Sequence, residues 1–320
     1  MPELYVGELH WSVTPGSNLL DALNQAGVAV PFSCRAGSCH ACLVRCEGEV
    51  DDQQPEALSP TQRQQGWRLA CQCRVIADLK VDAFDPQRDG LPAQVVGADW
   101  LSSTVLRLRL QPERALRYRA GQHLVLWAGQ VARPYSLASL PQEEPYLEFH
   151  IDCRQPGAFS DAARQLKVGD PVCLGELRGG ALHYDPDWQS RPLWLLASGT
   201  GLGPLWGVLR EALRQDHQGE IRVIHLAHEA EGHYLAEPLA ANAGCNCGWF
   251  PGTPWPCFVG TLPASRPFPS ACSWRACRVI NCWRMCSWLA LLRYEKPGQV
   301  GIGAYRPEPM TPSQASQLPQ

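Results

Sequence analysis

A short stretch at residues 31–42, PFSCRAGSCHAC, constrains this chain more than any other. It holds Cys34, Cys39 and Cys42 at the spacing C-x4-C-x2-C, and a fourth candidate, Cys71, stands in the distant run GWRLACQCR. Three thiolates from one loop and a fourth from a separate segment form the ligand pattern of a [2Fe–2S] cluster. The sequence therefore predicts a protein built around an iron–sulfur centre.

The residues between these cysteines suit an anionic cluster. Ala36, Gly37 and Ser38 are small enough to let backbone N–H groups turn toward the sulfurs, and Gly37 can adopt a positive φ. Two other interpretations are open. One is a zinc site, which usually has two C-x2-C pairs, whereas Cys71 and Cys73 form C-x-C. The other is a set of thiols without any metal. The spacing favours the cluster over both.

Composition narrows the class of protein. The 320 residues are enough for two or three domains, and 28 Lys and Arg against 31 Asp and Glu predict neither a nucleic-acid partner nor a basic membrane-binding patch. The N-terminal run MPELYVGELHW lacks signal-peptide character, and no stretch reaches the roughly 20 apolar residues of a membrane helix. Fifteen cysteines then indicate metal and redox use in a reducing compartment. We expect a cytoplasmic protein.

Residues 1–84 show the pattern of a small domain with a mixed sheet. Two short alternating strands precede a helix, SNLLDALNQAG, for which Ser17 is the predicted N-cap and Gly27 the predicted stop. The cysteine loop follows, and further strands close the domain. Cys71 and Cys73 would point to opposite faces of one of these strands, so that only one of them can be the fourth ligand.

A turn-rich linker at residues 84–92 marks the first predicted boundary. From there to about residue 190, apolar and polar residues alternate with period two, which predicts a small antiparallel barrel at 90–190. This part carries the run RPYS at residues 133–136 and the run PGAFS at residues 156–160, which opens a predicted helix. A guanidinium binds phosphate oxygens, an aromatic ring can cover a flat cofactor, and a helix N-terminus attracts anions.

The run RPYS resembles the R-x-Y-S element of the ferredoxin–NADP reductase superfamily. The resemblance implies that Arg133 binds the flavin pyrophosphate, that Tyr135 lies on the isoalloxazine face and that the Ser136 hydroxyl lies near flavin N5. In the same family a Gly-x-x-Ser element, here Gly157 and Ser160, places a helix N-terminus against the flavin diphosphate. A diphosphate site implies FAD rather than FMN.

A third predicted unit, residues 191–240, begins with the apolar run PLWLLA and the turn SGTGLGP. A helix with Pro204 in its first turn and a strand, IRVIHLAH, follow, as in a nucleotide-binding βαβ unit. The turn is similar to the G-T-G-x-A/G-P element of the same superfamily. The resemblance assigns dinucleotide binding to Gly199, Thr200, Gly201, Gly203 and Pro204. The acids in the run HEAE at residues 228–231 suit a free ribose 2′-hydroxyl, which favours NADH over NADPH.

Residues 241–320 break this pattern. Seven cysteines and five tryptophans crowd into residues 245–288, and no period of 2 or 3.6 lasts long enough to predict the strands that the superfamily has here. Three explanations are open. The stretch could be translated out of frame, because a one-base shift turns GC-rich Leu and Ala codons into Trp and Cys codons. It could be a divergent or disordered extension. The third is a metal site at Cys272, Cys277, Cys282 and Cys286.

Together, the three units resemble the reductase components of bacterial aromatic-ring oxygenases and related monooxygenases. The resemblance covers residues 1 to about 240. It implies a multidomain α+β and α/β fold: a β-grasp like that of plant-type ferredoxins, an antiparallel β-barrel FAD domain and an incomplete, Rossmann-like parallel-sheet NAD domain. In these ferredoxins the fourth ligand precedes a glutamine, which favours Cys71 as the ligand in this chain.

The resemblance implies an electron-transfer oxidoreductase. NAD(P)H would give a hydride to FAD, and FAD would pass single electrons to the [2Fe–2S] cluster and then to an oxygenase or another iron protein. No catalytic acid–base pair is expected, and the nine histidines are expected to be surface or packing residues because they lack metal-ligand spacing. The alternative is a non-enzymatic carrier that keeps cluster and flavin while its nucleotide domain takes no hydride.

Overall fold

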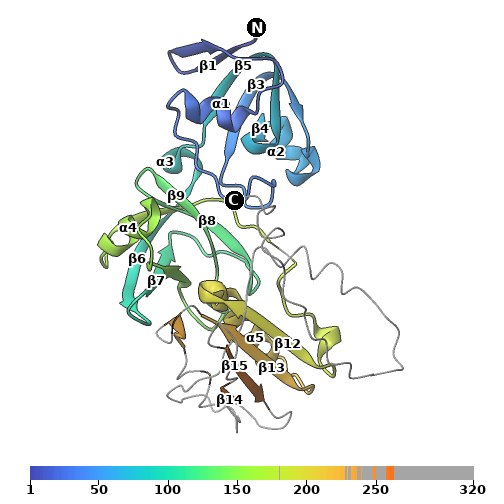
Figure 1. Ribbon diagram of the computed structural model, residues 1–320, viewed down its shortest axis with the longest axis vertical. Helices are drawn as coiled ribbons and strands as arrows, with labels where there is room; N and C mark the ends of the chain where they lie inside the picture. Colours follow the sequence, from blue (N-terminus) through green and yellow to red (C-terminus); the bar gives the residue numbers. More distant parts are fainter. Residues whose placement is uncertain are drawn as a thin grey trace, which may run out of the picture. The chain divides into compact units, whose positions relative to one another are not determined.

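The computed structural model describes residues 1–179, 181–227, 229, 232–235, 239, 248–249 and 257–262, the last two ranges as backbone only. All of them fall in one compact unit, Met1–Cys282. They form three sheets, of five, six and four strands (Figure 1). No helix in these ranges is long and apolar enough to cross a membrane. The metal site considered at Cys272–Cys286 lies outside the described residues.

The first sheet has the strand order β2-β1-β5-β3-β4, with β1 and β5 parallel and the other neighbours antiparallel. This is the β-grasp that we expected, with helix α1 packed on the sheet through fully buried leucines. Its strands are β1 (Glu3–Val6), β2 (Leu9–Ser12), β3 (Leu43–Asp52), β4 (Trp67–Leu69) and β5 (Cys73–Ala83). Its helices and helical turns are α1 (Leu19–Gln25), η1 (Pro55–Ala57), α2 (Pro60–Gln64) and η2 (Ala70–Gln72).

Two local predictions in this domain need correction. The N-cap of α1 is Asn18 and not Ser17, because the Asn18 side chain accepts a hydrogen bond from the backbone N–H of Asp21. Gly27 ends the helix as predicted, with φ +84°. Cys71 lies in the helical turn η2 and not in a strand, while Cys73 begins β5. The two thiols therefore lie in different environments because one is in a helical turn and the other in a strand, and not because they face opposite sides of one strand.

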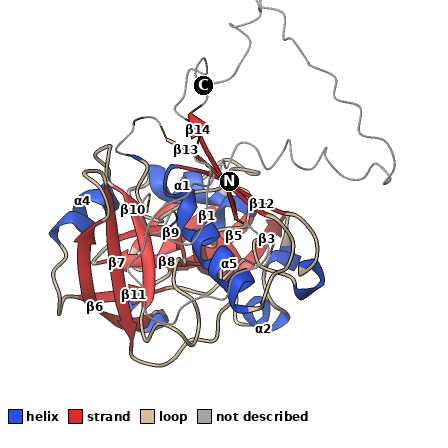
Figure 2. Cartoon of the chain, turned by 90° about the horizontal axis from the view of Figure 1, so that it is seen from below, coloured by secondary structure: helices blue, strands red, loops and turns tan. Residues whose placement is uncertain are grey.

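The second sheet is an antiparallel barrel with the strand order β10-β7-β6-β11-β8-β9. A bridge between Leu137 and Phe149 joins its two end strands and nearly closes it. The strands are β6 (Leu91–Trp100), β7 (Val105–Pro112), β8 (His123–Ala128), β9 (Val131–Ser136), β10 (Leu147–Asp152) and β11 (Pro171–Leu174). Helix α4 (Ala158–Gln165) packs on the barrel (Figure 2). A single helical turn, α3 (Pro86–Asp89), lies in the predicted linker (Figure 1).

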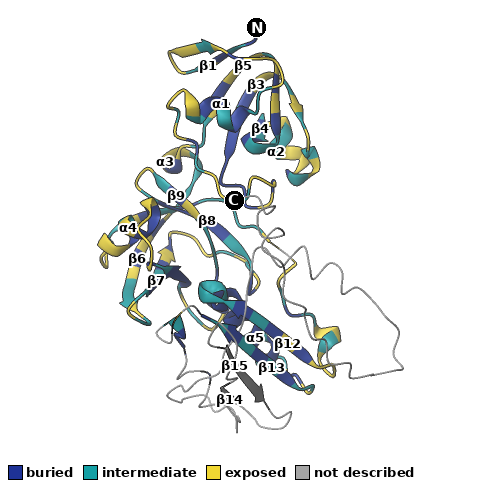
Figure 3. Cartoon of the chain, in the orientation of Figure 1, coloured by how far each residue is buried: buried dark blue, intermediate teal, exposed yellow. Residues whose placement is uncertain are grey.

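The third sheet begins as a βαβ unit. Strand β12 (Leu193–Ser198) is parallel to β13 (Ile221–Leu226), with the turn η4 (Gly199–Gly201) and helix α5 (Leu202–Arg214) between them. A further turn, η3 (Pro186–Trp188), precedes β12. The buried face of α5 and alternate residues of both strands form one core, which appears as dark segments in Figure 3. The fold class predicted for this unit is confirmed.

Two strands lie where we expected none. Strand β15 (Cys257–Leu262) runs antiparallel to β13, and β14 (Gly248–Trp249) pairs with β15. The absence of alternation had argued against strands here, but Phe258, Val259 and Thr261 are residue types that favour strands. Strand β15 pairs with β13 along its edge. This pairing, and not an alternating sequence pattern, makes residues 257–262 a strand.

Candidate functional site

The four predicted cluster ligands come together as two pairs of thiols. Cys34 and Cys39 are hydrogen-bonded through their sulfurs, and so are Cys42 and Cys71. These contacts lower the pKa of Cys34 and of Cys71, because each sulfur accepts a hydrogen bond, and they raise the pKa of their partners. Each pair therefore stabilises a thiolate, the form that binds metal.

The arrangement of the thiols in pairs suits a two-iron cluster. A structural zinc binds four ligands around one ion, whereas two pairs of thiols suit two irons that each take two protein ligands.

The backbone of the loop turns N–H groups toward the sulfurs. The N–H groups of Ala36 and Cys39 lie 3.3 and 3.4 Å from Cys34 Sγ, and the Gly37 N–H points to Cys71. Gly37 has φ +75°, as the sequence predicted, and a Cβ there would lie 2.4 Å from Gln54 Oε1. The Gln72 side chain adds a donor at 3.3 Å from Cys71 Sγ. This cradle of donors fits an anionic cluster.

Cys46 and Cys73 have a different environment. Both are buried in the apolar core of the domain, on strands β3 and β5. Burial raises the pKa of both thiols, to about 12 for Cys46. They are protonated packing residues, and this difference favours Cys71 over Cys73 as the fourth ligand.

The cluster loop, residues 31–42, contacts the β8–β9 hairpin, which carries RPYS. Cys39 and Ala41 pack against Val125, Trp127 and Ala132 in one apolar group. We call this contact the loop–hairpin seam.

Further contacts border the seam. The Phe84 ring stacks on Trp127 with 5.5 Å between centroids, and Arg133 Nη1 donates to the carbonyl of Phe32 at 3.2 Å. On another side, Glu176 accepts from Gln62 Nε2 at 2.9 Å and lies 3.6 Å from His40 Nδ1. The first domain and the barrel are thus joined at the cysteines by both apolar and polar contacts.

The residues predicted for flavin lie on β9 and at the start of α4. The centroids of Tyr135 and Phe159 are 5.0 Å apart, which brings the RPYS strand beside the helix. Burial raises the pKa of Tyr135, so the phenol is neutral. Ser136 pairs with His123 across the hairpin, and the Arg133 guanidinium is exposed. An exposed guanidinium and an aromatic ring on one strand suit the phosphate and ring portions of a flavin nucleotide.

Helix α4 offers an anion-binding end. Gly157 is its N-cap and supplies no side-chain cap, so the first-turn N–H groups depend on other acceptors. Asp161 accepts from the Gly157 N–H at 3.1 Å, while the Ser160 hydroxyl donates to the carbonyls of Gln155 and Gly157. Ser160 is buried and directed at its own turn. The Asp161 carboxylate occupies this helix end, and a diphosphate would have to take its place there.

The predicted nucleotide-binding turn, residues 198–204, joins β12 to α5. We call it the glycine turn. Gly199 has φ +52°, Gly203 and Pro204 are buried in the first turn of α5, and Gly201 precedes the helix. Gly199 and Thr200 line a small cleft together with Thr104, Asp152, Arg154, Ala227, Glu229 and Gly232. The structure thus brings the glycine turn to the end of β10, next to the segment that leads to α4.

Sequence patterns gave no indication of the side chains beneath the glycine turn. His150, His225, His233 and Tyr234 are all buried there. These three histidines are packing residues, as expected, and the rings also hydrogen-bond to the turn and to each other. Of the run at residues 228–231 that suggested NADH, Glu229 lines the cleft, and residues 228, 230 and 231 lie outside the described residues.

Comparison with known proteins gives two family matches. Residues 7–75 match the 2Fe-2S iron-sulfur cluster binding domain, and residues 94–181 match the oxidoreductase FAD-binding domain. Reductase component 1 of terephthalate 1,2-dioxygenase from Comamonas sp. is 31% identical over 246 residues, or 74% of this chain and 73% of the relative. This chain belongs to the reductase components of oxygenase systems.

Two further relatives agree with this family. The reductase subunit of an aromatic O-demethylase from Amycolatopsis sp. is 34% identical, over 69% of this chain and 70% of its own length. The reductase component of phenol 2-monooxygenase from Pseudomonas sp. is 32% identical, over 72% of this chain and 69% of its own length. The chain is accordingly an NAD(P)H-dependent flavoprotein reductase, with a [2Fe–2S] cluster and FAD as cofactors.

Proposed function

We propose that this reductase takes electrons from NADH and delivers them, through FAD and the [2Fe–2S] cluster, to the oxygenase component of its own system. The observation that carries the proposal is the loop–hairpin seam, where Cys39 packs on the same hairpin that bears RPYS. When bound, the flavin accepts a hydride and releases its electrons one at a time, as the cluster requires. The protein supplies position and electrostatics.

Each motif is proposed to have the role that its spacing or the family resemblance implies. Cys34, Cys39, Cys42 and Cys71 would bind the two irons, and backbone N–H groups would balance the charge of the cluster. Arg133, Tyr135, Ser136, Gly157 and Ser160 would bind FAD, and the glycine turn would bind the dinucleotide. The domain boundaries belong to the same proposal. Two separate apolar cores support the domains at 1–84 and 90–190, and the βαβ unit supports the domain at 191–240.

NADH is the proposed donor in preference to NADPH. Glu229 lines the cleft beside Gly199 and Thr200. A carboxylate can accept a hydrogen bond from a ribose 2′-hydroxyl and would repel a 2′-phosphate. The expected result is a kcat/KM for NADH at least tenfold above that for NADPH, and Glu229→Gln should narrow the difference.

A cytoplasmic location is also proposed. It is supported by the eight cysteines of the described residues, all of which are free thiols in this structure. An oxidising compartment would threaten both the cluster ligands and the buried thiols.

Anaerobic titration with NADH tests the proposal directly. Purified protein should show flavin and iron–sulfur absorption, and NADH should bleach both. Dithionite, which needs no nucleotide site, should bleach both in any case and serves as the control. Bleaching by dithionite alone would support the non-enzymatic carrier instead, and a protein that holds neither chromophore after anaerobic reconstitution would contradict both functions.

A further inference from the structure

The glycine turn is held from its inner side by two buried rings. The Gly199 carbonyl lies 2.9 Å from His225 Nε2, and the Tyr234 hydroxyl donates to the Thr200 carbonyl at 3.4 Å. Since a carbonyl can only accept, Nε2 of His225 carries the proton in this contact. Both rings are almost completely buried, so water cannot replace these contacts.

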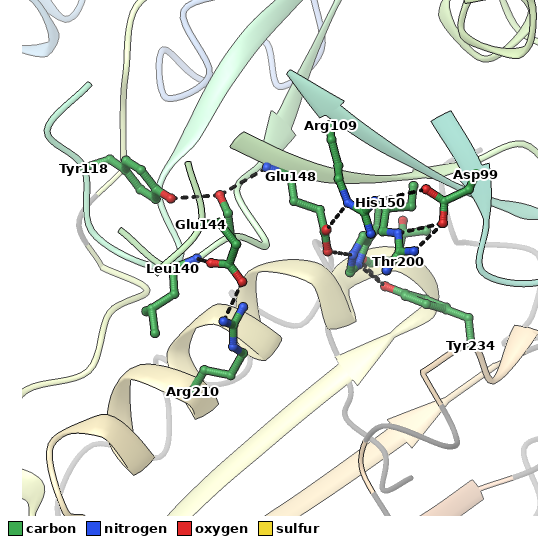
Figure 4. Close-up of polar contacts among 12 residues, drawn as sticks. Asp99, Arg109, Tyr118, Leu140, Glu144, Glu148, His150, Thr200, Arg210 and Tyr234 are labelled. Carbon is green, nitrogen blue, oxygen red and sulfur yellow. Dashed lines mark hydrogen bonds and ion pairs between the residues drawn. The ribbon is translucent and has the colours of Figure 1, made fainter. Parts of the chain in front are cut away.

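A chain of contacts links Tyr234 to the flavin barrel (Figure 4). His150, on β10, lies with Nδ1 3.2 Å from the Tyr234 hydroxyl and with Nε2 3.1 Å from Glu148 Oε1. Arg109 Nε donates to the other oxygen of Glu148 at 3.0 Å. Burial alone would raise the pKa of Glu148, but His150 and Arg109 outweigh it and lower that pKa to about 2. Glu148 is therefore ionised and fixes the orientation of His150.

His150 also sets how closely α5 approaches the barrel. A Cβ at Gly203 would lie 3.2 Å from His150 Nδ1 and 3.5 Å from its Cγ. The His150 and Tyr234 rings meet edge to face, with centroids 5.2 Å apart. A side chain at position 203 would therefore press on the imidazole, because the first turn of α5 lies directly beside that ring.

The two sides of the glycine turn are therefore coupled. Its outer side, at Gly199 and Thr200, forms part of the cleft wall, and the carbonyls of the same two residues are bound by His225 and Tyr234 on the inner side. Loss of an inner contact would leave the carbonyl concerned with the backbone N–H of Leu202 as its remaining partner, and would thereby loosen the turn that forms the cleft wall.

We infer that His150, His225 and Tyr234 are positioning residues that hold the glycine turn in the shape that binds the diphosphate of the dinucleotide. The inference rests on the proposed function of this turn. None of the three rings lines the cleft, so each acts through the backbone of the turn and not by contact with the ligand. The chain Arg109–Glu148–His150 extends this support to the flavin barrel.

One pair of matched substitutions tests the inference. Tyr234→Phe keeps the ring and removes the hydroxyl, which contacts the Thr200 carbonyl and His150 Nδ1. Tyr184→Phe is the control, because Tyr184 is buried in the same core and its hydroxyl lies 2.9 Å from His217 Nδ1, away from the turn. The probe is ADP-ribose, which carries the diphosphate and cannot transfer a hydride, titrated calorimetrically into the full chain with its cofactors. We expect Tyr234→Phe to weaken binding about 3- to 10-fold and Tyr184→Phe to leave it unchanged.

A second pair separates positioning from general stability. His150→Gln keeps a polar group for Tyr234 and Glu148, whereas His150→Leu has similar bulk and keeps none. We expect His150→Leu to raise the KM for NADH about tenfold at unchanged kcat, and His150→Gln to recover most of the loss. Dithionite reduction and the visible spectra should be the same in both, since neither depends on the glycine turn.

The outcomes are distinguishable. Wild-type protein that binds no ADP-ribose would refute the proposed function of the turn, and the inference with it. Binding that is weakened equally, or not at all, by Tyr234→Phe and Tyr184→Phe would overturn the inference alone. Thermal midpoints of the two Tyr variants are measured alongside. If Tyr234→Phe fails to fold, the contrast between His150→Leu and His150→Gln in KM decides the question.

Discussion

At the scale of single residues, the cluster site depends on which thiols give up their protons. In each pair one sulfur accepts a hydrogen bond from the other. The first proton of the pair is therefore lost at a lower pH than the proton of an isolated thiol. Cys71 is partly exposed and surrounded by donors, whereas Cys73 is fully buried among apolar side chains. Two cysteines that are separated by one residue thereby acquire opposite chemical roles.

This contrast predicts different outcomes for two serine substitutions. Cys71→Ser should abolish the visible absorption and the electron paramagnetic resonance signal of a [2Fe–2S] cluster, or shift both strongly, because one iron loses a thiolate. Cys73→Ser should keep the spectra and lose about 1–3 kcal/mol of stability, because a hydroxyl replaces a buried thiol. The assignment of the fourth ligand would be wrong if Cys73→Ser alone lost the cluster.

The pKa differences also predict the reactivity of the cluster-free protein. The hydrogen bond from Cys42 lowers the pKa of Cys71 to about 6, so Cys71 is a thiolate above pH 7 and is protonated only as the pH falls through 6. Its alkylation by iodoacetamide should therefore be nearly independent of pH between 7 and 9. Peptide mass spectrometry after short exposure measures the rate, and circular dichroism verifies that the protein stays folded.

Cys173 is the control for exposure in this experiment. It is partly exposed like Cys71, but burial raises its pKa. Its alkylation rate should rise about tenfold per pH unit over the same range, since only the thiolate reacts. Cys46, with a pKa raised to about 12, should remain unlabelled. Parallel pH profiles for Cys71 and Cys173 would show that the thiol pair does not stabilise a thiolate.

At the scale of elements, irregular backbone places the cluster loop and the strands around it. Strand β3 shifts register against β5 between Gly48 and Val50, and Gly48 has φ +124°. A Cβ at Gly48 would lie 2.7 Å from the carbonyl oxygen of Asp78. The bulge therefore needs glycine for two separate reasons, conformation and space.

Alanine substitutions at two glycines distinguish the cost of the backbone conformation from the cost of the steric clash. Gly7 has φ +57° in the β1–β2 turn with nothing within 4 Å of a Cβ, so Gly7→Ala should cost only the strain of a left-handed residue, about 1 kcal/mol. Gly48→Ala adds a backbone clash and should cost about 2–3 kcal/mol. Urea unfolding followed by cluster absorption measures both. Equal midpoints for the two variants would mean that the bulge relaxes without cost.

At the scale of the whole molecule, the loop–hairpin seam determines how the cluster domain meets the flavin barrel. The cysteines of residues 31–42 and the RPYS strand are about 100 positions apart in sequence, as the contact between Arg133 and the Phe32 carbonyl illustrates. Phe84 lies at the junction between the two domains and stacks on Trp127. Because electron transfer requires close approach of the two centres, the rigidity of this junction should affect its rate.

Phe84→Leu should slow reduction of the cluster by reduced flavin, on the order of tenfold, because it removes the stack on Trp127 and loosens the seam. Flavin reduction by NADH should be unchanged. Stopped-flow absorption at flavin and cluster wavelengths measures the two steps separately. Phe32→Leu is the control, since that ring lies under the Arg35 guanidinium of the cluster loop, and Arg133 binds the Phe32 carbonyl and not the ring. Unchanged cluster reduction in Phe84→Leu would exclude a role for the stack.

The identity of the cofactors was predictable because their motifs are local. Three ligands fall within nine residues, RPYS within four and the glycine turn within seven, so residue type and spacing nearly define each site. Residue patterns likewise predicted the barrel and the first βαβ unit, and the resemblance to plant-type ferredoxins implied the β-grasp. The predictions were wrong where a contact with another residue or strand determined the local structure. Asn18 caps α1 in place of Ser17, and β15 forms through pairing with β13.

Residue type and spacing thus indicate which chemistry the chain can carry: thiolates at cluster spacing, a flavin motif and a glycine turn. The pairing of the thiols, the packing of the cluster loop on the flavin hairpin, and the contact of His150 with Tyr234 across 84 positions follow from the folded chain alone. The physical reason is range. Spacing within a loop fixes the ligands that a metal or phosphate can reach, whereas a contact between distant residues exists only after strands have paired in register and burial has excluded water.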